Sequence, residues 1–229
     1  MSIAERIAEI RERMDKAASR FGHRPEDITL VGVTKTVEEE AIREGIQAGL
    51  TDIGENRVQE ILRKKDAFDG ARIHMIGRLQ SNKVRNLTQG IHLIQSVDRE
   101  SLLREMERIG AREVMEFQCL FQVNIAGEDQ KGGMGEEEVR PLLEKVEDLA
   151  HVRVRGLMMV APFAENVEEI RWTFRKMRKL YDDLKQVGYN RTEMKVLSMG
   201  MTHDFEVALE EGANMVRIGS AIFGKRNYQ

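Results

Sequence analysis

A lysine ends the first strongly apolar segment of the chain. The stretch ITLVGVTKT runs from Ile28 to Thr36, and every residue before Lys35 belongs in a buried strand. Burying an ammonium group is costly unless its charge is paired or discharged. A lysine in a low-dielectric site loses its proton more easily and can then attack a carbonyl carbon to form a Schiff base. The alternative is a lysine whose head reaches solvent at the strand end.

A second candidate site lies near the C-terminus, where glycines and hydroxyl residues cluster. The segments are LSMGMT (197–202) and VRIGS (216–220). Their glycines, Gly200 and Gly219, permit close backbone approach, and we expect hydroxyl groups at helix starts from Ser198, Thr202 and Ser220. Such loops bind phosphate through backbone N–H groups. The alternative is that the small residues only fill a tapering core and that Thr202 only caps a helix.

Arg217, in the second of these segments, has three possible roles. It could bind a phosphate, face a ring nitrogen, or form an ordinary ion pair with one of the 39 carboxylates. The pattern does not choose between them.

Composition excludes several other classes of function. With 36 basic and 39 acidic residues and a net charge of −3, the chain lacks the basic excess typical of nucleic-acid binding. The five histidines and Cys119 lack metal-ligand spacing, so we expect no metal site. A single cysteine and thirteen methionines favour a reducing, cytoplasmic setting. No segment has the length of a membrane span or the apolar core of a signal peptide.

The elements that must position these residues alternate regularly. Ile3, Ile7, Ile10 and Met14 predict an amphipathic N-terminal helix that ends at Gly22 and packs on the domain. Eight apolar strands are expected at residues 28–35, 51–55, 72–77, 91–97, 117–125, 154–160, 195–200 and 214–219. Helices are expected at 37–48, 56–67, 80–88, 99–110, 136–149, 166–187 and 203–211, with a short tail from Ser220.

This alternation predicts one α/β domain, a single (β/α)8 TIM barrel over residues 1–229 with the extra N-terminal helix. The helix over 37–48 is expected to begin with a capping box from Thr36 to Glu39 and to end near Gly49. Barrel active sites collect at the carboxyl ends of the strands, and phosphate frequently binds after strands 7 and 8. Lys35 and both glycine-containing segments fall at this end. Asn56 and His74 lie near strand ends as well, where each could contact a ligand or be a hydrogen-bonded polar residue of the core, which is the commoner outcome. Lys131, in the glycine-rich loop after strand 5, could also reach a ligand there.

Several motifs identify a family that this chain resembles. They are VTKT (33–36), GENRVQE (54–60), HMIGRLQSNKVR (74–85), VNIAGEDQKGGM (123–134), RGLMMVAP (155–162) and LSMGMTHDFEVALEEGANMVRIGSAIFG (197–224). Together they resemble the pyridoxal phosphate homeostasis proteins (YggS-like), which share the N-terminal barrel of alanine racemase. Two positions depart from the usual pattern, His203 before Asp204 and the segment MMVAP. Neither departure removes a hydroxyl group or a glycine from the expected site.

The resemblance implies a cofactor and residues that bind it. Lys35 would hold pyridoxal 5′-phosphate (PLP) as an internal aldimine, with Asn56 close to the ring. The phosphate end would be lined by Ser198, Gly200, Met201, Thr202, Arg217, Gly219 and Ser220. The implied function is vitamin B6 homeostasis without catalytic turnover, with PLP-dependent apoenzymes as possible partners of a monomer.

Two enzyme classes remain as alternatives. The first is a low-activity PLP-dependent amino-acid racemase, although racemisation needs an acid/base group on each face of the substrate and the sequence offers no second base beyond Lys35. The second is a Schiff-base aldolase or phosphate-binding isomerase that uses the same barrel without a cofactor.

Overall fold

Eight parallel strands close into a barrel in the computed structural model, which describes residues 1–128 and 131–224. Strand β1 pairs with both β2 and β8, so that Val31 lies beside Asp52 on one side and Arg217 on the other. The strands are β1 (Thr29–Val33), β2 (Asp52–Glu55), β3 (Arg72–Met75), β4 (Ile91–Val97), β5 (Phe117–Gln122), β6 (Val152–Met158), β7 (Thr192–Ser198) and β8 (Met215–Ile218). The predicted (β/α)8 barrel is confirmed.

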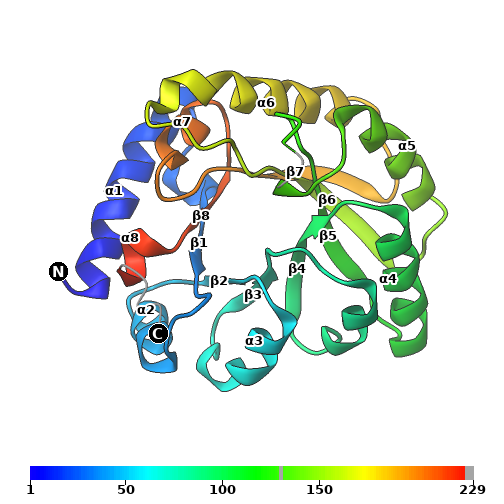
Figure 1. Ribbon diagram of the computed structural model, residues 1–229, viewed down its shortest axis with the longest axis horizontal. Coiled ribbons are helices and arrows are strands. Elements are labelled where there is room, and N and C mark those ends of the chain that lie inside the picture. The colour runs from blue at the N-terminus through cyan, green and yellow to red at the C-terminus, as the bar shows by residue number, and fades with distance from the viewer. Residues whose placement is uncertain (129–130, 225–229) are drawn as a thin grey trace.

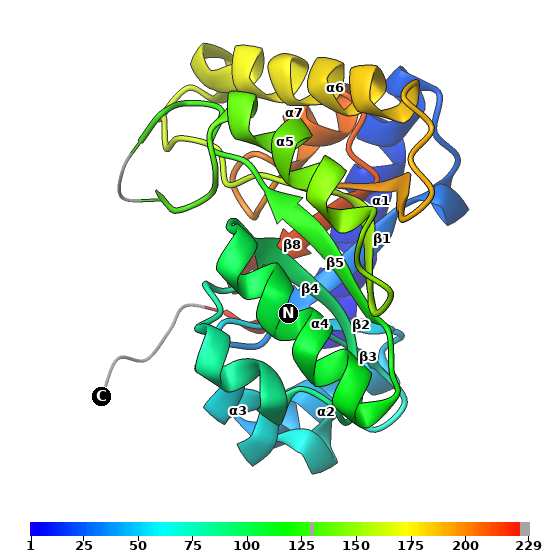
Figure 2. The same cartoon turned by 90° about the vertical axis from the view of Figure 1, so that its right-hand side faces the viewer.

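Helices form a ring around the strands (Figure 1). Helices α5, α6 and α7 cover one side of the barrel, and α2 and α3 cover the opposite side (Figure 2). The α-helices are α1 (Ile3–Phe21), α2 (Glu39–Gln47), α3 (Val58–Arg63), α4 (Glu100–Glu113), α5 (Glu136–Val146), α6 (Arg171–Lys185), α7 (Phe205–Glu210) and α8 (Ser220–Phe223). Short 3₁₀ segments are η1 (Pro25–Asp27), η2 (Lys65–Ala67), η3 (Ser81–Asn86) and η5 (Val167–Ile170). The helix expected over 80–88 forms as the shorter 3₁₀ helix η3.

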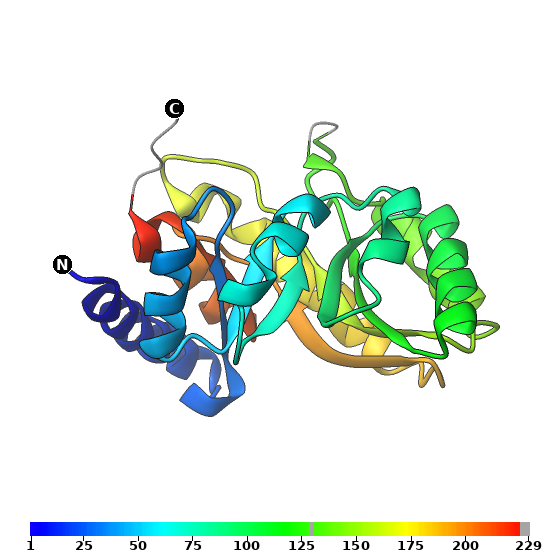
Figure 3. The ribbon, with the colours of Figure 1, turned by 90° about the horizontal axis from the view of Figure 1, so that it is seen from below.

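The extra helix α1 begins and ends where the sequence indicates. Ser2 and Glu5 form a capping box at its start, and Gly22 ends it with φ +91°. Its apolar stripe packs against α2, α7 and α8, and it lies with α8 at one end of the molecule (Figure 3). An ion pair of 2.8 Å between Arg13 and Glu206 joins α1 to α7.

The capping box predicted between Thr36 and Glu39 is wrong. Helix α2 has Glu38 at its N-cap position, without a side-chain hydrogen bond. Thr36 instead has φ +62°, in the left-handed region, and its hydroxyl donates to Lys35 O at 2.6 Å. Strand β1 ends at Val33, and Val37 N donates to Thr34 O at 3.0 Å to close a turn. Lys35 therefore lies in a tight turn rather than in the strand.

The described residues also bear on the membrane and metal expectations. No helix within them is long and apolar enough to span a bilayer. The same residues contain no group of three or more His, Cys, Asp or Glu side chains placed to hold a metal ion. Cys119 is buried, and burial raises the pKa of its thiol.

Candidate functional site

A fully buried lysine lies directly beneath the turn that carries Lys35. Lys64 follows α3, and its ammonium group donates to Thr34 O at 2.9 Å and to Glu55 Oε1 at 3.0 Å. It also pairs with Glu60 at 3.0 Å. An ammonium group has three N–H donors, and each has an acceptor here. Lys64 thereby ties the carboxyl end of β1, one residue before Lys35, to the end of β2.

The carboxylate of Glu55 is the less satisfied member of this cluster. Its Oε1 accepts from Lys64 and also from the Thr34 hydroxyl at 2.8 Å, whereas Oε2 is buried without a partner within the described residues. Burial raises the pKa of the Glu55 carboxyl, although Thr34 and Lys64 act in the opposite direction. Such a cluster holds the two strand ends in a fixed position. Removing one of its members would leave a buried charge without a partner.

Asn56 comes next along the chain and lies against β3. A Cβ atom on Gly77 would come within 2.3 Å of Asn56 O, so only glycine permits this backbone approach. Asn56 is thereby held at the same end of the barrel as Lys35, as the sequence predicts.

A second buried cation lies at the ends of β6, β7 and β8. The guanidinium group of Arg217 is 4% exposed, and it donates to Ser198 Oγ at 2.6 Å and to Met159 O at 2.7 Å. No hydrogen bond or ion pair joins Arg217 to a carboxylate within the described residues. Burial lowers the pKa of Arg217 to about 10.

A chain of neutral groups connects this cation to a carboxylate deeper in the barrel. Ser198 Oγ donates to Gln95 Oε1 at 2.7 Å, and Gln95 Nε2 contacts His74 Nδ1 at 2.9 Å. His74 Nε2 then contacts Asp52 Oδ1 at 2.8 Å. All four residues are buried. Every donor can point from Arg217 toward Asp52 when the His74 proton lies on Nε2. We call Ser198, Gln95 and His74, which connect the two charged groups by hydrogen bonds, the relay.

Asp52 is held as a carboxylate by its hydrogen bonds. Burial disfavours the charged form, but bonds from His74, Arg72 and Thr51 outweigh burial and lower the pKa of Asp52 to about 2. His74, for which the sequence suggested ligand contact or a hydrogen-bonded core role, lies in the core.

The two glycine-containing segments come together at the carboxyl ends of β7 and β8. Ser220 Oγ donates to Thr202 Oγ1 at 3.3 Å, and both hydroxyls lie at the surface of the barrel mouth. Gly200 has φ +96°, and a Cβ atom there would lie 2.9 Å from Phe205 Cα. A Cβ atom on Gly219 would lie 3.2 Å from Val33 O, so glycine allows β8 to approach the end of β1 beside Lys35.

The structure also shows where the other residues predicted for this end of the barrel lie. Ser198 is the last residue of β7 rather than the start of a helix, so its hydroxyl faces the barrel interior. Met201 is 37% exposed, and its N–H donates to Asp204 Oδ1 at 2.6 Å. Lys131 donates to Ala161 O at 2.8 Å and pairs with Glu128.

Sequence reasoning missed Lys64 and Glu60, and it placed Gln95 at the carboxyl end of a strand without predicting its partners. A signal existed for Lys64, because it continues the three-residue spacing of Val58 and Ile61, both buried. A lysine on an apolar helix face is expected only where its charge is paired. The partners of Gln95 could not be predicted, because His74 comes from the neighbouring strand β3 while Ser198 comes from β7, across the barrel.

The arrangement suits a ligand with a carbonyl group and a phosphate group. A primary amine lies after β1, and paired hydroxyls follow β7 and β8, which are the next strands around the barrel. Hydroxyl donors and close backbone approach are typical of phosphate sites at this end of a (β/α)8 barrel. The residues present therefore fit the cofactor that the sequence motifs implied.

Comparisons with known proteins agree with this geometry. The family model described as "Alanine racemase, N-terminal domain" matches residues 6–227. The pyridoxal phosphate homeostasis protein of Aquifex aeolicus is 44% identical over 230 residues, which cover all of both chains. That of Escherichia coli K12 is 37% identical over 99% of this chain and 97% of its own. The structure of PipY from Synechococcus elongatus with PLP bound is 31% identical, with a TM-score of 0.84 over 97% of this chain and 100% of PipY.

Proposed function

The chain belongs to the pyridoxal phosphate homeostasis proteins, and we propose that it binds PLP at the carboxyl ends of β1, β7 and β8. The observation that carries the proposal is that the amine of Lys35 and the hydroxyl pair expected to bind phosphate lie on neighbouring parts of the barrel. Gly219 lets the end of β8 approach Val33 at the end of β1, and the Thr202–Ser220 hydroxyl pair lies in the segments that follow β7 and β8, the strands next to β1 around the barrel. The PLP-bound structure of PipY supports the same cofactor.

Each residue of the site has a proposed task. When bound, PLP supplies an aldehyde that condenses reversibly with a primary amine. Lys35 offers that amine, and the Lys64 cluster holds its turn in place. Thr202 and Ser220 bind the phosphate, with Gly200, Met201 and Gly219 shaping the backbone around it.

Arg217, Ser198 and Asn56 are assigned to the ring. The guanidinium group of Arg217 bonds to Ser198 and to Met159 O, inside the barrel, rather than to the Thr202–Ser220 pair. This favours contact with the ring nitrogen over contact with the phosphate. Asn56, held against Gly77, lies at the end of β2 on the other side of Lys35.

The site supports binding better than racemisation. A two-base racemase needs a second acid/base group opposite the lysine. The Tyr181 hydroxyl is bonded to Met194 O on the outer side of the barrel, and Tyr189 precedes β7 at the amino end. Tyr228 lies outside the described residues. The relatives, moreover, carry names that describe homeostasis and not a reaction.

The proposal extends to organisation and setting. We assign binding to residues 1–229 as one domain that acts as a monomer in the cytoplasm, with PLP-dependent apoenzymes as recipients of the cofactor. Nucleic acid and membrane are not among the proposed partners, since the chain has a net charge of −3.

Reductive trapping tests the proposal. The purified protein is saturated with PLP, reduced with borohydride, and digested for peptide mapping. We expect the phosphopyridoxyl group on Lys35, and its loss in Lys35→Ala but not in Lys145→Ala, a surface lysine paired with Glu100. An unmodified Lys35 in the saturated protein refutes the assignment.

A second assay separates the carrier from the racemase. The loaded protein is incubated with single L-amino acids, and the D-form is followed with time. Turnover at about 1 s⁻¹ or faster would refute the carrier function while leaving the cofactor site intact.

A further inference from the structure

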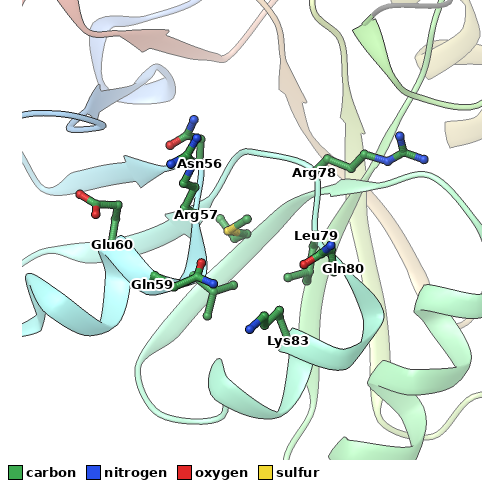
Figure 4. Close-up of a pocket in the computed structure, with 10 residues that line it drawn as sticks. Asn56, Arg57, Gln59, Glu60, Arg78, Leu79, Gln80 and Lys83 are labelled. Atoms are coloured by element: carbon green, nitrogen blue, oxygen red, sulfur yellow. The ribbon is translucent and has the colours of Figure 1, made fainter. Parts of the chain in front are cut away.

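A cavity of about 400 Å³ lies beside Asn56, between the start of α3 and the loop that leads from β3 to η3 (Figure 4). Its residues follow the carboxyl ends of β2 and β3, so it opens at the same end of the barrel as Lys35. The close contact of Gly77 with Asn56 fixes one part of its wall. The volume is within the range of small-molecule sites.

The charge in this cavity is unbalanced. Arg57, Arg78 and Lys83 line it, and Glu60 is the one carboxylate among the lining residues. Glu60 already pairs with Arg63 at 2.9 Å and with Lys64 at 3.0 Å. Figure 4 shows the Glu60 carboxylate pointing away from Lys83. The cavity therefore presents cations without a carboxylate that could neutralise them.

These cations also have spare hydrogen-bond donors. Within residues 1–128 and 131–224, the side chains of Arg57 and Lys83 make no hydrogen bond or ion pair. Arg78 lies 3.9 Å from Asp98, which already pairs with Arg99 at 2.6 Å. Arginines elsewhere are commonly paired, and Arg171 contacts three carboxylates. Unpaired cations occur elsewhere on the described surface, Arg140 among them, but here Arg57, Arg78 and Lys83 line one cavity.

Apolar and amide groups complete the lining. Met75, Val58 and Leu79 are at most 4% exposed and form an apolar floor. In Figure 4 the Lys83 ammonium group and the Gln59 amide point toward each other from opposite walls. A charged head can therefore bind at the rim while a short apolar body rests on the floor.

We infer that this cavity binds a small organic anion, a carboxylate or a phosphate ester with a short apolar body. Cationic donors with an amide between them suit an anionic oxygen group. A zwitterionic amino acid fits less well, because its ammonium group would meet Arg57 and Lys83 while Glu60 is already paired. The site shares Asn56 with the proposed cofactor site but neither Lys35 nor the Thr202–Ser220 pair, so the anion and the cofactor would lie side by side and can be tested separately.

Calorimetric titration of the full chain at low salt tests the inference with four probes of similar body. These are 4-methylpentanoate, isobutyl phosphate, the neutral 4-methylpentanamide, and leucine. We expect saturable binding of at least one anion, with the amide and leucine about tenfold weaker or more. The tighter of the two anions identifies the head group. The inference is overturned if neither anion saturates by about 20 mM, or if the amide or leucine binds as tightly as the better anion.

Variants then locate the site. Lys83→Met and Arg57→Met should each weaken the better anion about fivefold or more, because each removes a charged donor. Arg140→Met is the matched control, since Arg140 is an exposed arginine of α5 without a side-chain partner in the described chain. Equal weakening by Arg140→Met, or no weakening by Lys83→Met, contradicts the site. Lys35→Ala should leave this affinity unchanged while it abolishes cofactor trapping, so the two proposals fail separately.

Discussion

The candidate cofactor site has a buried cation at each end, and the two cations are held in different ways. Lys64, beneath the Lys35 turn, touches Glu55 and Glu60 directly at 3.0 Å. Arg217, at the ends of β7 and β8, reaches Asp52 only through Ser198, Gln95 and His74. One end is a compact ion cluster, and the other is a cation whose hydrogen-bond partners within the described residues are the neutral Ser198 hydroxyl and the Met159 carbonyl.

This difference fits the proposed tasks of the two ends. The amine must be held in a fixed position, and a saturated ammonium group that joins two strand ends provides that rigidity. An arginine proposed to face a ring needs donors directed into the site, which a directly paired carboxylate would occupy. The carboxylate that favours the charged form of Arg217 is Asp204, and no hydrogen bond or ion pair joins these two side chains within the described residues, so Asp204 does not occupy the Arg217 donors.

The largest expected effect on stability comes from removing the Lys64 ammonium group from the compact ion cluster. Lys64→Met should lower the free energy of unfolding by about 3–5 kcal/mol, because it leaves buried Glu55 without its partner. Urea unfolding measures the loss, and the double variant Lys64→Met/Glu55→Gln should recover part of it. Lys65→Met is the control, since the neighbouring Lys65 is exposed. A loss below about 1 kcal/mol in Lys64→Met would mean that the cluster contributes little.

The next largest effect is a loss of stability at acid pH, which depends on Asp52 at the far end of the relay. The pKa of Asp52 is about 2 in the folded protein against an ordinary value of 3.8. A depressed carboxyl pKa stabilises the fold above pH 4, and this stability is lost as the pH falls from about 4 to 2. The contribution is about 2 kcal/mol.

Unfolding measured from pH 2 to 6 tests this dependence. Asp52→Asn should flatten the curve between pH 4 and 2, whereas Asp66→Asn, at an exposed position in η2, should not. The same slope in wild type and Asp52→Asn would contradict a charged Asp52 as the end of the relay.

The two ends also differ in how well they could be predicted from the sequence. Lys35, Thr202, Ser220 and the barrel were predictable, because strand ends and their loops follow from the local alternation of apolar and polar segments. The relay could not be predicted from the sequence. Gln95, His74 and Ser198 come from three different strands, and their side chains meet only when the sheet closes into a barrel. Thr36 shows a local failure, because its hydroxyl bonds to the neighbouring carbonyl instead of capping α2.

A smaller effect is expected from interrupting the relay in its middle. Ser198→Ala leaves Gln95 Oε1 and one Arg217 donor without a partner in the barrel interior, at a cost of about 1–2 kcal/mol. Combined with Asp52→Asn, it should show a coupling energy above about 0.5 kcal/mol, because both groups belong to one network. Additive losses in urea unfolding would mean that Ser198 and Asp52 act separately. Ser101→Ala, at an exposed position of α4, provides the control.

The smallest effect on stability should fall on the residues proposed to bind phosphate. Thr202→Val removes a hydroxyl whose partner within the described residues is Ser220 Oγ at 3.3 Å, near solvent. The free energy of unfolding without cofactor should change by less than about 0.5 kcal/mol. Release of PLP, followed by its absorbance after dilution, should nevertheless be about threefold to tenfold faster, because a donor to a charged phosphate is lost. Thr88→Val, at a hydroxyl bonded only to Arg85 O, should leave release unchanged. If Thr202→Val also leaves release unchanged, the phosphate binds elsewhere, and the comparison then concerns only the amine and ring ends.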